Sequence, residues 1–555
     1  MNAPTRVWDS LQRNRAERLA RAQSALGSDL AGKALPAARI EDLLHAVLEC
    51  GDRVCIEGNN QKQADFLAGA LCRLDPQRIN NLHMLQSVLT LPEHLDVFDR
   101  GIASKLDFSF SGPQAGRVAK LASAGKLNIG AIHTYLELFG RYFIDLPPRV
   151  SLVAAEAADR KGNIYTGPNT EDTPVIVEAT SFKNGIVIVQ VNRIMDELPR
   201  IDIPGDWVDF VVESPSPYYI EPLFTRDPAQ ISEIQVLMAM MAIKGIYAEY
   251  QIQRLNHGIG FDTAAIELLL PTYAESLGLR GKIATNWALN PHPALIPAIE
   301  AGFVDSIHSF GSELGMENYI RARPDVFAVG PDGSMRSNRA YCQAAGHYAC
   351  DMFIGSTLQI DLQGNSSTAT LGRIAGFGGA PNMGADARGR RHASPAWLKA
   401  GQQARAGTGA IPRGQKLVVQ MVETFREHMQ PAFVEKLDAW ELAEQAKMAI
   451  PPVMIYGDDV THILTEEGIA NLLLCRTAEE REQAIRGVAG YTPVGLARDK
   501  RMVENLRDRG IIQRAEDLGI DKRMATRDLL AAKNMKDLVR ASGGLYDPPK
   551  RFRNW

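Results

Sequence analysis

The sequence has few cysteines, and none of them has the spacing of a disulfide framework or a zinc site. Six cysteines occur among 555 residues, and no Cys-x-x-Cys pair is present. Secreted chains that depend on disulfides carry cysteines at higher density, and thiolate zinc sites place them in close pairs. We therefore expect a reducing, cytoplasmic environment and no thiolate metal site.

The sequence also lacks a long hydrophobic run and a large excess of charge of either sign. The longest apolar helical run, at 236–243, ends at Lys244, far short of the ~20 residues that span a bilayer. Residues 6–25 are highly charged and contain acids, unlike a signal or transit peptide. The 61 basic and 65 acidic residues give a net charge of −4. These features argue against a membrane and against nucleic acid as partners.

The fingerprints of several common catalytic and nucleotide sites are missing as well. Gly-Ile-Gly-Phe-Asp-Thr at 258–263 has Thr263 where a dinucleotide site needs its third glycine. There is no Walker loop, no His-x-His or His-Glu-x-x-His spacing and no Gly-x-Ser-x-Gly elbow. NAD, ATP, a dedicated metal and a serine hydrolase are therefore disfavoured.

Short β-like runs that alternate with helix-length segments indicate an α/β protein with open, mostly parallel sheets flanked by helices. The apolar residues of these runs are nearly continuous, as in strands buried on both faces. Strands are predicted at 53–58, 150–157, 185–192 and 209–214. Helices are predicted at 6–25, 61–74, 231–250 and 425–448.

A dense group of prolines divides the chain into two lobes. Six prolines lie between residues 199 and 228, and such density stops helices and central strands. Strand, polar turn and helix occur at 53–71 and again at 254–270, so we expect similar lobes with a ligand site between them. The predicted parts are an N-terminal helical extension (1–45), a first lobe (46–225), a second lobe with the glycine loop (226–500) and a charged C-terminal appendage (501–555).

The most informative segment, 355–393, contains a strand-like run at 358–362 and a glycine loop at 376–384. Residues 372–414 include ten glycines, and seven basic residues against one acid. Glycines let backbone amides approach a ligand, and an amide that stabilises an oxyanion is typically worth ~3–4 kcal/mol. Such a loop alone is as often a tight connector. The local charge of +6 favours an anionic ligand over a solvated loop.

Five motifs in order resemble the acetyl-CoA hydrolase/transferase family, whose fold has two similar CoA-transferase-like lobes. They lie at 51–71, 154–173, 256–270, 359–383 and 460–473. Longer stretches resemble, more specifically, the α-subunit family of bacterial malonate decarboxylases. Among these are YTGPNTEDTP at 165–174 and LQGNSSTA at 362–369.

This resemblance implies an acyl-carrier-protein transferase that exchanges acetyl for malonyl on a carrier thiol. Acetyl-S-carrier and malonate would give malonyl-S-carrier and acetate. The thiol would belong to a phosphoribosyl-dephospho-CoA arm on the carrier subunit, so the chain itself would bind no resident cofactor. The implied partners are this acyl carrier subunit and the carboxyltransferase-like decarboxylase subunits.

The resemblance also implies the site residues. Gln359 stands where the family pattern has a nucleophilic glutamate, and an amide is no nucleophile at neutral pH. We therefore predict that a malonate carboxylate attacks the acetyl thioester directly and forms a mixed anhydride. The predicted catalytic residues are Gln359, which orients the carboxylate, and Gly378 and Gly379, whose amides hold the oxyanion. Glu313 is an alternative nucleophile.

The remaining predicted site residues bind the substrate and the arm. Those expected near the substrate or thioester are Gly58, Asn59, Asn60, Gly167, Pro168, Asn169, Asn256, His257, Gly258, Gly260, Asn365 and Gly376. Those expected to contact arm phosphates or an acidic carrier surface are Arg388, Arg390 and Arg391.

Two other functions stay open. The first is an ordinary CoA-transferase or hydrolase that uses free CoA, against which Gln359 counts. The second is a non-catalytic scaffold that only docks the carrier, which the intact Gly-Phe-Gly-Gly loop disfavours. The favoured transferase would use carrier-bound acetyl, the CoA enzyme would use acetyl-CoA, and the scaffold would use neither thioester.

Overall fold

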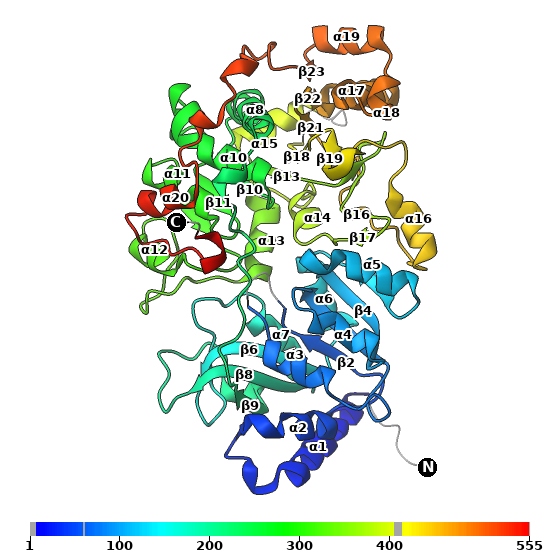
Figure 1. Ribbon diagram of the computed structural model, residues 1–555, viewed down its shortest axis with the longest axis vertical. Coiled ribbons are helices and arrows are strands. Elements are labelled where there is room, and N and C mark those ends of the chain that lie inside the picture. Colours follow the sequence, from blue (N-terminus) through cyan, green and yellow to red (C-terminus); the bar gives the residue numbers. More distant parts are fainter. Residues whose placement is uncertain (1–6, 59–61, 405–412, 554) are drawn as a thin grey trace.

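The computed structural model describes residues 7–58, 62–404, 413–553 and 555, and the chain forms two α/β lobes (Figure 1). The first lobe lies at the bottom of this view and the second lies above it. Each lobe is built on one sheet of mostly parallel strands with flanking helices, which confirms the predicted fold class. The chain passes from one sheet to the other between Glu213 and Arg254, close to the predicted junction. The other domain limits stay a prediction.

The main strands of the first sheet pair in parallel. In spatial order they are β1 (Ala34–Leu35), β9 (Phe210–Glu213), β8 (Ile186–Ile194), β6 (Val150–Ala158), β2 (Arg53–Ile56), β3 (Leu82–Val88), β4 (Ala103–Phe110) and β5 (Asn128–Ile132). Successive residues of β2 enter different cores: Val54 and Ile56 belong to one cluster and Cys55 to the other. Helices therefore cover both faces, which explains why apolar residues run continuously along these strands. A short strand, β7 (Ile164–Tyr165), pairs antiparallel with β6.

The helices of the first lobe follow its strands along the chain. They are α1 (Val7–Leu26), α2 (Ile40–Val47), α3 (Asp65–Cys72), α4 (Glu93–Asp99), α5 (Ala115–Ser123), α6 (Tyr135–Ile144) and α7 (Thr173–Phe182).

The second sheet is parallel except at one edge. Its spatial order is β12 (Ser306–His308), β11 (Asn286–Ala288), β10 (Arg254–His257), β13 (Met352–Gly355), β18 (Leu417–Met421), β21 (His462–Thr465), β22 (Gly468–Asn471) and β23 (Ile512–Gln513). The last two pairings, β21–β22 and β22–β23, are antiparallel. The helices that position the site are α8 (Glu233–Ala242), α10 (Phe261–Leu269), α13 (Arg339–Ala349) and α14 (Ala380–Met383).

Most of the predicted elements are confirmed. The four predicted strands correspond to β2, β6, β8 and β9, and the helices at 6–25 and 61–74 correspond to α1 and α3. The helix at 231–250 is also present, and it is continued beyond α8 by a π-helical turn and a short last turn. A capping box formed by Ser232 and Gln235 fixes its start.

Three local predictions in the second lobe are wrong. The segment 425–448 is a small hairpin, β19 (Phe425–Arg426) with β20 (Gln430–Pro431), and only α16 (Asp438–Gln445) is helical. Pro431 and the left-handed residues His428 and Met429 are incompatible with a helix there. The run at 358–362 forms only a two-residue strand outside the main sheet, β14 (Gln359–Ile360). Part of the predicted glycine loop is the short helix α14.

Near both ends of the described chain a short strand pairs with a lobe's sheet, so the predicted C-terminal appendage packs on the second lobe, and its limits stay a prediction. β1 pairs with β9, and β23 pairs with β22. Leu538 of α20 (Met535–Ala541) and Tyr546 lie in the core of the second lobe. Many charged residues at 501–555 are exposed, while several apolar residues, among them Val503 and Leu506, are buried. In the part of the chain that the structure describes, no helix is both long and apolar enough to cross a membrane.

Candidate active site

The glycine loop of the second lobe is joined to the end of β4 in the first lobe. The amides of Phe377 and Gly378 donate to the carbonyl of Ser109 at 2.7 and 2.9 Å, and the Ser111 amide donates to the Ala375 carbonyl at 2.8 Å. Gly376 has a φ of +76°, and a Cβ there would lie 2.5 Å from the Ser109 oxygen. Only glycine permits this approach of the two backbones. The loop is therefore a connector between the lobes as well as a pocket wall.

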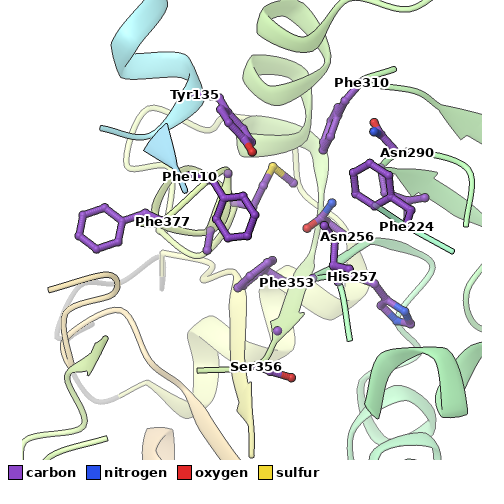
Figure 2. A pocket seen from close by; sticks show the side chains of 18 of the residues that line it. Phe110, Tyr135, Phe224, Asn256, His257, Asn290, Phe310, Phe353, Ser356 and Phe377 are labelled. Atoms are coloured by element: carbon purple, nitrogen blue, oxygen red, sulfur yellow. The ribbon is translucent and has the colours of Figure 1, made fainter. Parts of the chain in front are cut away.

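A cavity of about 250 Å³ lies beside this loop, between the lobes (Figure 2). Aromatic and methionine side chains from both lobes form most of its wall. They are Phe110, Tyr135, Phe224, Phe310, Phe353, Phe377, Met383 and Met454. Its polar lining residues are Arg226, Asn256, His257, Asn290, His292, Gln343, Ser356 and Thr368. An apolar cavity with a few polar groups is the usual form of a small-molecule site.

One buried carboxylate holds both histidines of the pocket. Oε1 of Glu267 on α10 lies 2.9 Å from Nδ1 of His257 and 2.8 Å from Nδ1 of His292. Burial opposes ionisation of Glu267, but the two histidines outweigh it and lower its pKa to about 2. Burial also lowers the pKa of His257. An ionised Glu267 accepts from both Nδ1–H groups, so Nε2 is the remaining polar atom of each ring. Nε2 of His257 lies 2.7 Å from the Tyr247 hydroxyl.

Two other polar groups of the pocket have no matching partner within the described part of the chain. Oδ1 and Nδ2 of Asn290 are both buried without a hydrogen bond. Nη1 of Arg226 donates to the carbonyls of Leu223 and Thr225, but no ion pair joins this guanidinium to a carboxylate of the described residues. Burial lowers the pKa of Arg226. Leaving a buried amide such as that of Asn290 without a partner costs about 1–3 kcal/mol, so Asn290 is a candidate to bind a ligand, and Arg226 has further donors to offer beside its two carbonyl contacts.

Two further cavities adjoin the pocket, and together they are called the groove. A second cavity shares Phe110 and Ser356 with the pocket, and a third shares Ser356 and Arg373 with the second. The third is also lined by Arg426, whose buried Nε has no hydrogen-bond partner in the described chain, while Arg373 is exposed.

A cluster of buried charges lies behind Tyr135, where α13 meets the first lobe. The Arg339 guanidinium stacks over the Tyr135 ring at 4.5 Å. It forms ion pairs with Glu171 and, at 3.3 Å, with Asp172. All three charged side chains are fully buried. This cluster fixes one wall of the pocket relative to the other lobe.

Six of the residues predicted from the sequence line the pocket. They are Asn256, His257, Gly258, Gly376, Gly378 and Gly379. Gly260 begins α10 just outside it. Gly167, Pro168 and Asn169 lie at another contact between the lobes, where the Asn169 side chain accepts from the Ser312 amide at 3.4 Å. Gly58 is buried against the carbonyl of Val88, and Asn59 and Asn60 lie outside the described residues.

Four predicted roles do not fit the structure. Gln359 is buried outside the pocket lining, and its Oε1 accepts from the Asp438 amide at 2.9 Å. The amide of Gly378 is used by Ser109 and is not free for an oxyanion. Arg390 is buried in an ion pair with Asp351 at 2.6 Å, so it cannot contact a carrier, unlike the exposed Arg388 and Arg391.

The fourth is the role of Asn365 in binding, because its side chain closes a turn. Its Nδ2 donates to Asp361 at 2.9 Å, and its Oδ1 accepts from the Gly457 amide at 2.8 Å. Both polar atoms of this amide are therefore occupied by the turn itself.

Four residues of this region were not predicted from the sequence: Arg226, Asn290, His292 and Glu267. Asn290 and His292 directly follow β11, so the rule that polar residues at strand ends form sites would have found them. Glu267 is an acid within an apolar helical run, which also signals a buried polar role. Among the described residues, no group of three or more His, Cys, Asp or Glu side chains is placed to hold a metal ion.

Comparison with known proteins identifies the family. A family model described as "Malonate decarboxylase, alpha subunit, transporter" matches residues 7–555. The acetyl-S-ACP:malonate ACP transferase of Malonomonas rubra is 64% identical over 553 residues, which cover 99% of each chain.

Solved structures agree with this match. A chain of a Pseudomonas malonate decarboxylase hetero-tetramer in complex with malonate is 59% identical, with full coverage of both chains and a TM-score of 0.95. The malonate decarboxylase α subunit of Acinetobacter baumannii is 55% identical, covers 99% of this chain and 100% of its own, and also has a TM-score of 0.95. A citrate lyase α subunit from Streptococcus mutans shares the fold, with 15% identity, 93% and 86% coverage and a TM-score of 0.58. The chain belongs to the malonate decarboxylase α-subunit family.

Proposed function

We propose that this protein transfers an acyl carrier protein from acetate to malonate, acting in a multisubunit malonate decarboxylase. In this reaction acetyl-S-carrier and malonate give malonyl-S-carrier and acetate. The named activity of the Malonomonas rubra relative supports it. The observation that carries it here is the interlobe pocket, where the glycine loop faces polar groups that have no partner in the described chain.

The carrier's thiol arm, a phosphoribosyl-dephospho-CoA group, enters through the groove. The apolar Phe110 and Leu223 suit its chain, and Arg373 and Arg426 at the outer end suit its phosphates. These two arginines take the place of Arg390 in the predicted contact, while Arg388 and Arg391 remain available to the carrier surface. The carrier subunit and the carboxyltransferase-like subunits are the proposed partners, and the proposed location is the cytoplasm.

The chemistry needs only positioning and stabilisation of charge. A malonate carboxylate oxygen attacks the acetyl carbonyl, and collapse of the tetrahedral intermediate expels the thiolate and leaves an acetyl–malonyl anhydride. The thiolate then attacks the malonyl carbonyl, and acetate leaves with the bridging oxygen. Proximity of this kind can supply ~7–11 kcal/mol of a barrier. No net proton is transferred.

Gly379 is the better of the two predicted oxyanion donors. It precedes α14, and its amide has no acceptor within the described chain. A Cβ on Gly379 would lie 2.2 Å from Nε2 of Gln343, so a second amide donor is adjacent. Donors fixed before the reaction stabilise a developing oxyanion without reorganisation.

Glu313 is the alternative for a covalent route. It is fully buried, its Oε1 accepts from the Thr225 hydroxyl at 2.6 Å, and it lies behind Phe224 rather than in the pocket lining. The direct route needs no movement of this side chain. Trapping with hydroxylamine separates the two, since only a glutamyl intermediate would leave a stable mass shift on the protein.

The test mixes the full-length protein with acetylated carrier and labelled malonate and follows the carrier by intact mass. A shift from acetyl to malonyl thioester, with release of acetate, supports the proposal. Malonyl-CoA formed from acetyl-CoA, without carrier exchange, would favour a CoA-transferase. Exchange with neither thioester would leave only a scaffold role.

A further inference from the structure

We propose that Arg226 and Asn290 bind the malonate carboxylate that does not react with the thioester, and so make the site specific for a dicarboxylate. This inference rests on the proposed function. Malonate and acetate must occupy the same pocket as substrate and product, and they differ by one carboxylate. Selection of malonate therefore requires a counter-charge for that group, placed away from the reacting thioester.

Arg226 has the chemistry for this contact. It is the one Lys or Arg among the described residues that line the pocket. Its Nη1 is held by the Leu223 carbonyl at 2.7 Å and the Thr225 carbonyl at 3.0 Å, and its guanidinium lies 5.7 Å from the centre of the Phe261 ring. No acceptor for Nη2 or Nε lies in the described chain. A guanidinium positioned in this way offers further donors to a carboxylate.

Asn290 supplies an independent observation. Its side chain is 1% exposed, lines the pocket and has no hydrogen bond on either polar atom. Figure 2 shows it beside Phe224, on the side of the pocket opposite Phe377 of the glycine loop. A carboxylate here would accept from Nδ2 of Asn290 and from Arg226. The reacting end of malonate would then extend towards Gly379.

The same wall contains His292. Its ring stacks on Phe224, with centroids 5.5 Å apart and planes at 19°, while Glu267 holds its Nδ1. This stacking fixes Phe224, which lies two residues before Arg226 and lines the same pocket. The polar end of the pocket is therefore built before any ligand arrives, which lowers the entropic cost of binding.

The competing explanation is that Arg226 only offsets the nearby charges of Glu313 and Glu267, which act on it electrostatically without an ion pair. In that case the arginine would support the fold or the reaction in general. Its loss would then affect acceptors with one and with two carboxylates equally. The two explanations predict different substrate profiles.

The test compares two exchange reactions of the full-length protein with acetylated carrier. One converts acetyl to malonyl carrier with malonate, and the other exchanges labelled acetate into acetyl carrier. For R226Q we expect the KM for malonate to rise about 10- to 100-fold, with acetate exchange changed by less than about threefold. N290A should shift malonate KM in the same direction by a smaller factor. An equal loss in both reactions would overturn the proposal.

Arg551 provides the matched control. It lies close enough to act on Arg226 electrostatically, but it is half exposed, paired with Glu221 at 2.6 Å and outside the pocket lining. R551Q removes the same charge and should leave malonate KM within about twofold. A rise in malonate KM as large as that of R226Q would mean that the long-range electrostatic field, and not direct contact with Arg226, governs malonate binding. That result would also overturn the proposal.

Calorimetric titration of malonate separates this inference from the proposed function. If the wild-type protein exchanges no acyl group yet binds malonate, and R226Q binds it much more weakly, the transferase fails and the carboxylate site stands. If R226Q does not fold, N290A decides: unchanged malonate binding by this variant contradicts the site.

Discussion

Two arginines near the pocket lie in opposite electrostatic surroundings. Arg339 is fully buried and forms ion pairs with Glu171 and Asp172 across the contact between the lobes. Arg226 is half-buried in the pocket wall and has only backbone carbonyls as acceptors among the described residues. A buried charge that has its counter-charge within the protein belongs to the fold. A pocket charge without one is available to a ligand.

The largest expected effect is on the lobe contact. At about pH 9, above the raised pKa of Glu171, R339M leaves the Glu171 and Asp172 carboxylates buried without their cation, and it should lower the free energy of unfolding by about 3–5 kcal/mol. Denaturant unfolding measures this loss. The control is R336M, because Arg336 is exposed and lies 3.5 Å from Asp332, and this change should cost less than about 1 kcal/mol. Similar losses in the two variants would mean that the buried ion pairs of Arg339 stabilise the fold no more than the exposed pair of Arg336.

The second largest effect is expected at Glu267, where a substitution should reduce activity and leave stability nearly unchanged. E267Q keeps an amide oxygen that can accept from both Nδ1–H groups, but it removes the negative charge that stabilises both protons there. We expect acyl exchange to fall about 10²-fold. The variant should remain folded, with circular dichroism and melting close to wild type. A large loss of stability with normal activity in the folded fraction would mean that Glu267, like Arg339, stabilises the fold and does not support the reaction.

The third prediction concerns pH and the lobe contact. Burial raises the pKa of Glu171 to about 8 against the attraction of Arg339. A carboxyl whose folded pKa is raised stabilises the protein fully at acidic pH, and this contribution is lost as pH rises through about 8. From about pH 6.5 to about pH 9, wild type should therefore lose on the order of 2 kcal/mol more stability than E171Q. Parallel pH profiles of unfolding for the two proteins would contradict this assignment.

The smallest effect is expected at Gln359. Its amide is occupied by Asp438 outside the pocket, so it resembles Arg339 in having its partner within the protein. Q359A should cost about 1 kcal/mol of stability and change acyl exchange by less than about threefold. Kinetic assay of the folded variant checks this. A loss of activity much greater than the loss of stability would restore the catalytic role that the sequence suggested.

The sequence predicted strands better than isolated turns and hairpins. β2, β6, β8 and β9 are buried on both faces, so their apolar runs report their position directly. The segment at 425–448 has helical composition in its second half only. Its first half contains His428 and Met429, whose left-handed main-chain conformation is incompatible with a helix. The composition of the segment does not reveal this conformation.

Part of the proposed site was visible in the sequence, for a similar reason. The ends of β10 and the glycine loop were found because strand-end polar residues and glycine clusters are visible along the chain. The roles of Gln359 and Arg390 were mistaken because their partners, Asp438 and Asp351, are distant in sequence and satisfy them elsewhere.

The sequence by itself determined the two-lobed α/β architecture, the glycine loop and the family resemblance, because hydrophobic periodicity and local motifs encode them. Only the tertiary structure decided which polar groups have partners and which face the pocket. Arg226, Arg339 and Arg390 are the same residue type, and nothing in their local sequence separates them. Their difference is the position of a carboxylate that a distant part of the chain supplies or withholds.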